Sequence, residues 1–77
     1  MDRLKITKEV IDLAYEVAEV EVLEDDNLKE YGMDSIALVS LIVEIEIKYN
    51  IMISDDDLNP NNLISVKNIV DIMEKYL

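Results

Sequence analysis

The segment that most constrains the fold is SIALVSLIVEIEIKY, residues 35–49, which contains neither glycine nor proline. It is too long for an ordinary strand, so its length favours a helix even though its many β-branched residues would suit a strand. Asp34 precedes it and is a good N-cap, because its carboxylate accepts hydrogen bonds from first-turn amides and lies at the positive end of the helix dipole. We therefore expect a helix that begins at Asp34 or Ser35 and ends near Tyr49.

On a helical wheel this segment has three faces. The face expected to enter a core carries Leu38, Leu41, Ile42, Ile45 and Tyr49. A narrow polar arc carries Ser40, Glu44 and Lys48. The other flank carries a second apolar row, which we name the flank stripe: Ile36, Val39, Val43 and Ile47. Two interpretations of the flank stripe are open: it packs on the preceding loop through Leu28 and Tyr31, or it contacts a partner protein.

The pattern TKEVIDLAYEVA predicts a first helix that starts near Lys8. Thr7 is the expected cap, and Ile6 and Ile11 are expected to pack across it as a hydrophobic staple. A loop over residues 24–33 should follow. Its apolar anchors are Leu28 and Tyr31, and Gly32 supplies a backbone angle that other residues resist.

Two further helices are expected in the last third of the chain. Asn59 followed by Pro60 predicts a very short third helix over residues 60–63. Ser65 is the expected cap of a last helix with one apolar face, formed by Val66, Ile69, Val70, Met73 and Leu77. The sequence therefore predicts an all-α fold, a small four-helix bundle with three main helices and a short third one, as a single domain over residues 1–77.

The charge of the chain limits its partners. It has 18 acidic and 7 basic side chains, and the formal net charge of -11 repels phosphate backbones and anionic lipid headgroups. We expect no nucleic-acid partner and no membrane insertion, since there is also no apolar run of about 18 residues and no signal-peptide pattern. The expected state is a cytoplasmic monomer that meets partners with a basic face.

Catalysis and metal binding have few candidate residues. The chain contains no cysteine and no histidine. The stretch DDDLNP has the first ligand spacings of a calcium loop, but Pro60 stands where glycine must turn and Val66 where a glutamate should chelate. Ser35 lacks the flanking glycines of a nucleophile elbow, and no histidine is present to take its proton. We therefore predict neither an enzyme nor a metal site.

The stretch YGMDSIALVSLIVEIEIKYNIMIS resembles the centre of acyl carrier and peptidyl carrier proteins. In that family an apolar residue, glycine, any residue, aspartate, serine and an aliphatic residue open the second helix. The likeness extends to Leu28, Tyr49, Ile53 and Val66 and covers nearly the whole chain. It implies that a separate phosphopantetheinyl transferase attaches 4'-phosphopantetheine from coenzyme A to Ser35, and that Asp34 serves transferase recognition.

The resemblance also implies a function for the thiol of that arm, which would carry acyl or aminoacyl groups as thioesters between a loading enzyme and downstream synthases or transferases. The second helix is less acidic than in carriers of fatty-acid synthesis, which favours a specialised pathway of the nonribosomal peptide, polyketide or D-alanyl type. The expected partner-binding residues are Ile36, Val39, Val43, Glu44, Glu46 and Ile47. The alternative function is an unmodified helical interaction domain that uses the same flank stripe.

Overall fold

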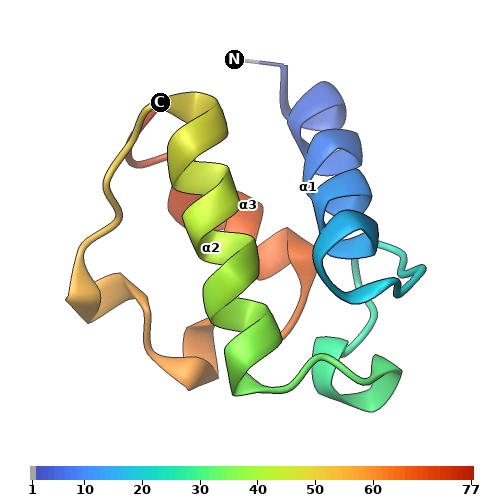
Figure 1. Cartoon of the computed structure of the whole chain (residues 1–77). Helices are drawn as coiled ribbons and strands as arrows, with labels where there is room; N and C mark the ends of the chain where they lie inside the picture. The colour runs from blue at the N-terminus through green and yellow to red at the C-terminus, as the bar shows by residue number, and fades with distance from the viewer. Residues whose placement is uncertain (1) are drawn as a thin grey trace.

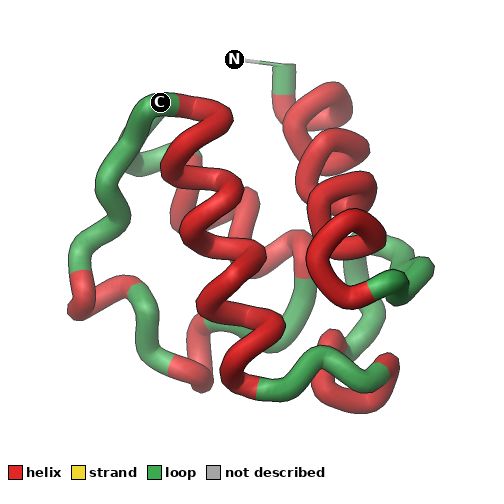
Figure 2. The backbone as a smooth tube through the Cα atoms, in the orientation of Figure 1, coloured by secondary structure: helices red, strands yellow, loops and turns green. Residues whose placement is uncertain are grey.

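The computed structural model describes residues 2–77, and its main elements are three α-helices: α1 (Arg3–Ala18), α2 (Ser35–Tyr49) and α3 (Val66–Met73). Single 3₁₀ turns lie in the connections: η1 (Leu28–Tyr31), η2 (Asp55–Asp57) and η3 (Pro60–Asn62). In Figure 1, α1 and α2 stand side by side and α3 lies behind them, while Figure 2 shows that the connections are long. None of the described residues is in a strand, and the all-α prediction is confirmed.

Helix α2 is the element that the sequence predicts best. Asp34 is its N-cap, with the carboxylate Oδ1 accepting from the backbone N–H of Ala37 at 2.8 Å. The helix ends at Tyr49, where Asn50 adopts a left-handed conformation with φ 53°. On the predicted core face four residues are buried, with Leu41 and Ile45 completely inaccessible to solvent, and Tyr49 is partly buried.

Helix α1 begins a full turn before the predicted start at Lys8. Asp2 is the cap, and its carboxylate accepts from the N–H of Lys5 at 3.2 Å. The prediction of Thr7 as cap, with a staple of Ile6 and Ile11 across it, is wrong, since Thr7 is buried inside the helix. The reason is that the buried face of α1 already includes Ile6, so the helix must begin early enough to present it.

The segment between α1 and α2 is anchored at one of the two residues predicted to anchor it. Leu28 is completely buried, whereas Tyr31 is about half exposed, so its predicted role as an anchor is wrong. The second anchor is Met33, which is completely buried and donates its N–H to the carbonyl of Leu28 at 3.1 Å. Gly32 adopts φ 95°, the left-handed angle that favours glycine, and this lets the chain turn into α2.

Helix α3 starts with a reciprocal cap between Ser65 and Asn68, in which each side chain accepts from the other residue's backbone N–H. The predicted face of this helix is buried from Val66 to Met73. Leu77 is the exception: the helix ends at Met73, and Leu77 is about half exposed. The short third helix exists as the single turn η3, with Asn59 as its cap.

One core joins the three helices, because α1 packs against both α2 and α3. Its completely buried side chains include Val10, Leu41, Ile45, Ile69 and Val70. Polar contacts tie the helices at the periphery: Arg3 pairs with Asp71 and Glu74 of the C-terminal segment, and Lys48 pairs with Glu9 at 3.2 Å. Within residues 2–77, no helix is long and apolar enough to cross a membrane.

The last turn of α2 also contains a buried hydroxyl. Tyr49 Oη is inaccessible to solvent and has no well-formed hydrogen bond. Burial first, and the nearby Glu9 carboxylate second, raise the pKa of Tyr49 to about 12. The phenol is therefore neutral at physiological pH and serves as part of the contact between α1 and α2.

Candidate functional site around Ser35

Ser35 is the first residue of α2, and its side chain is exposed. The chain reaches it through a fixed corner, in which Gly32 turns the backbone and Met33 is buried against the core. The buried residue on one side and the helix on the other hold the backbone of Ser35, while nothing encloses its hydroxyl. A group attached to Ser35 Oγ would therefore extend into solvent without disturbing the fold.

The immediate electrostatics of Ser35 have two opposing parts. The N-terminus of α2 presents free amides and the positive end of the helix dipole, which favour an anionic group. Asp34 opposes this with a negative charge, although one of its oxygens is bonded to Ala37 N–H. The chain has no histidine, the commonest general base, to activate the hydroxyl. No group of three or more acidic, histidine or cysteine side chains in residues 2–77 is placed to hold a metal ion.

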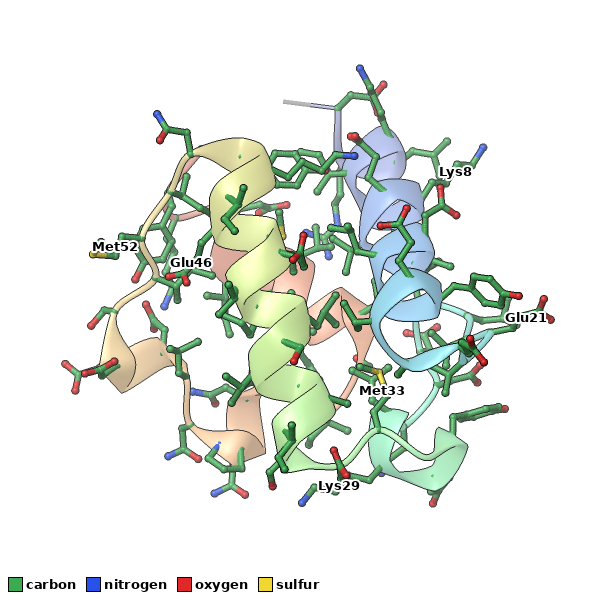
Figure 3. All side chains as sticks on the ribbon, in the orientation of Figure 1. Lys8, Glu21, Lys29, Met33, Glu46 and Met52 are labelled. Carbon is green, nitrogen blue, oxygen red and sulfur yellow. The ribbon has the colours of Figure 1, made fainter. Side chains whose placement is uncertain are left out.

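A groove of about 260 Å³ begins at Ser35 and lies between α2 and the connection to α3. One wall is the α2 surface, and the other is formed by Leu58, Pro60 and Leu63. The lining is mainly apolar and contains two charged side chains, Lys29 and Glu46. Figure 3 shows Lys29 at the foot of α2 and Glu46 several turns further along the helix.

The flank stripe is exposed on the surface of α2. The exposed fractions of its side chains are 78% for Ile36, 63% for Val39, 43% for Val43 and 69% for Ile47. The interpretation that the stripe packs on the preceding loop is therefore wrong. Val39 and Val43 also line the groove, so the stripe forms one lip of it.

The two acids of α2 differ in their surroundings. Glu44 is exposed, whereas Glu46 is partly buried and its Oε2 accepts from the backbone N–H of Ile53 at 2.9 Å. Glu46 thus fastens the start of the α2–α3 connection to the helix. The sequence gives no signal for this contact, because the donor is a backbone amide in an irregular segment.

The groove itself could not be found from the sequence. Its walls come from α2 and from residues after Ser54, and only the folded chain brings them together. Lys29 was also missed, because a lone lysine in an acidic loop has no motif around it. Its position in the lining depends on how the single turn η1 is placed against α2.

Comparisons with known proteins agree with this geometry. The family model described as a phosphopantetheine attachment site matches residues 7–72. The crystal structure of an acyl carrier protein from Thermotoga maritima superposes with a TM-score of 0.79 and 28% sequence identity, covering 97% of this chain and 89% of that one. No curated protein matches the chain in sequence.

Proposed function

The chain belongs to the family of phosphopantetheine attachment sites, and from this we propose that Ser35 is the residue that receives the arm. The family and the fold together make it a carrier protein of the acyl-carrier type, which holds the prosthetic group for other enzymes and is not itself an enzyme. The observation that carries the assignment to Ser35 is its exposed hydroxyl at the first residue of α2, directly after the capping Asp34.

The attachment is a phosphoryl-group transfer. Ser35 Oγ attacks the phosphorus that bears the pantetheine group in the pyrophosphate of coenzyme A. The bond to the bridging oxygen breaks, adenosine 3',5'-bisphosphate leaves, and a base of the transferase takes the hydroxyl proton, because this chain has no histidine to do so. Asp34 has one oxygen not used by its cap hydrogen bond, and we assign that oxygen to recognition by the transferase.

Once attached, the arm supplies a terminal thiol that carries an acyl or aminoacyl group as a thioester. The residues of the chain contribute the anchor and the surroundings of the arm. The start of α2 favours the negative charge of the phosphodiester, and the apolar groove beside Ser35 offers the arm a surface on which to lie.

The surface of α2 supports a specialised carrier rather than one of primary fatty-acid synthesis. Four apolar side chains are exposed on the flank stripe, while Glu44 is the acid of this helix that remains free for a partner. The cognate loading enzyme and the downstream enzymes would contact the flank stripe and Glu44. The other acidic side chains of the chain would attract these enzymes electrostatically as they approach. Nonribosomal peptide, polyketide and D-alanyl transfer systems are the candidate pathways, with the carrier acting as a cytoplasmic monomer.

The test of the attachment is the intact mass of the protein after incubation with coenzyme A, magnesium and a broad-specificity phosphopantetheinyl transferase. We expect the mass of one arm to be added to the wild type and to Ser40→Ala, a matched control that removes another exposed serine of α2. Ser35→Ala should gain nothing while keeping its helical circular-dichroism spectrum. Modification of Ser35→Ala would refute the assignment, and an unmodified wild type would favour the alternative of an interaction domain.

A further inference from the structure

We propose that Lys29 is the counter-charge for the phosphodiester formed at Ser35, and that it positions the first part of the arm at the mouth of the groove. This inference rests on the proposed attachment at Ser35. It concerns a residue six positions before the serine, on a separate element, that no motif singles out.

The backbone of Lys29 is held in a fixed place relative to the groove. Its N–H donates to Asn27 Oδ1 at 3.0 Å, and its carbonyl accepts from the N–H of Gly32 at 3.2 Å. The preceding residue, Leu28, is completely buried. The side chain of Lys29 is exposed and lines the same groove as Ser35, at the foot of α2 in Figure 3.

Lys29 is also available for a new ion pair. Three of the basic side chains, Arg3, Lys48 and Lys75, already pair with carboxylates. Lys29 has no carboxylate within ion-pair distance among residues 2–77, and it is the only cation in the groove lining. Among the lining residues it is therefore the one able to neutralise an anion at Ser35.

A phosphodiester at Ser35 needs such a partner. It would lie next to the carboxylate of Asp34, in a chain whose formal net charge is already -11. The helix dipole helps, but Asp34 already occupies the Ala37 N–H of the first turn. The Lys29 ammonium, which lines the same groove as Ser35, would offset the repulsion that the cap aspartate introduces.

The experiment compares four proteins in apo form and after loading by the transferase: wild type, Lys29→Gln, Lys29→Arg and Lys8→Gln. Lys8 is an exposed lysine of α1 that Figure 3 shows far from the foot of α2, so it matches the loss of charge without the location. Intact mass first establishes that each protein carries the arm. Thermal unfolding at low and high salt and the phosphorus NMR line width of the phosphodiester are then measured.

We expect the change in Tm on loading to be lower for Lys29→Gln than for wild type by roughly 1–8 °C at low salt, the range for one exposed ion pair in a domain of this size. The difference should shrink at high salt, and the phosphorus line should narrow because the phosphate moves more freely. Lys29→Arg should behave as wild type, and Lys8→Gln should shift apo and loaded forms equally.

Equal shifts of the apo and loaded forms in Lys29→Gln, together with an unchanged phosphorus line width, would overturn the role of Lys29 while leaving the attachment intact. A wild type that gains no mass would overturn the attachment itself, and with it the proposal for Lys29. The two failures are thus distinguished by the mass spectrum before any melting curve is recorded.

Discussion

Neighbouring isoleucines of α2 allow the surface role of the flank stripe to be separated from a role in the core. Ile47 is 69% exposed, whereas Ile45 is completely buried. Burying a whole isoleucine side chain stabilises by about 1.5–3 kcal/mol. The part of Ile47 that is buried in the fold therefore contributes at most about 1 kcal/mol to stability, and burying the exposed part against a partner would contribute about 1–2 kcal/mol to binding. Ile47→Gln should therefore lower stability by at most about 1 kcal/mol.

The matched substitution Ile45→Gln places a polar amide in a site with no solvent. The variant loses the free energy of burying the isoleucine and also pays the desolvation of an amide without hydrogen-bond partners. Together these lower the free energy of unfolding by about 3–6 kcal/mol. Total stability for a chain of this length is roughly 4–12 kcal/mol, so Ile45→Gln should remove a large part of it and lower the urea midpoint far more than Ile47→Gln does. Urea denaturation followed by circular dichroism measures both variants on the same scale.

For binding, the loss of about 1–2 kcal/mol at Ile47 predicts a Kd for the loading enzyme that is roughly 5- to 30-fold weaker. Glu44→Gln should instead slow association, with an effect that fades as salt is added, because Glu44 acts through steering. Surface plasmon resonance at two salt concentrations separates the two effects. An Ile47→Gln protein that unfolds like Ile45→Gln, or that binds with unchanged Kd, would refute the assignment of the stripe as a partner surface.

Two further predictions concern the loops that frame the site. The hydrogen bond from Tyr76 and the Lys75 ammonium lower the pKa of Asp57 in the folded protein. The ionised Asp57 carboxylate therefore stabilises the fold at any pH above its unfolded-state pKa, and this stabilisation is lost as the pH falls through the lower folded-state pKa. Asp57→Asn should therefore be less stable than wild type at pH 7, and the difference should shrink as the pH falls below about 4, as urea denaturation across pH would show. A difference that stays constant into acid would contradict this. Gly32→Ala should lower stability by about 1–2 kcal/mol in the same assay, because a residue with a side chain is strained at φ 95°. The strain comes from the backbone alone, since no atom lies within 4 Å of the added Cβ. An unchanged stability would show that the backbone at this corner relaxes.

The sequence predicts those parts of the fold that depend on neighbouring residues. The Asp34 cap, the Gly32 turn and the Ser65 cap are all decided within a few residues, and each is where the sequence places it. The start of α1 is different, because Thr7 and Asp2 are both acceptable caps locally. Only the need to bury Ile6 in the core decides between them, and that need comes from the other helices.

The same distinction applies to the candidate site. A helical wheel finds the flank stripe, but what covers the stripe depends on the path of the preceding loop, which the wheel does not contain. The sequence offered Leu28 and Tyr31 as the cover; in the structure Leu28 enters the core and Tyr31 faces solvent. Lys29 and the far wall of the groove depend in the same way on how the connections cross α2.

The choice of Ile47 for the binding experiment follows from the way the stripe and the groove share residues. Val39 and Val43 belong to both surfaces, so a partner that covers the stripe also covers the lip of the groove beside Ser35. Substitutions at either valine change the surroundings of the arm together with the partner surface, and a loss of binding at these positions has two explanations. Ile47 lies on the stripe outside the groove lining, and a change of Kd at this position therefore reports on the partner surface alone.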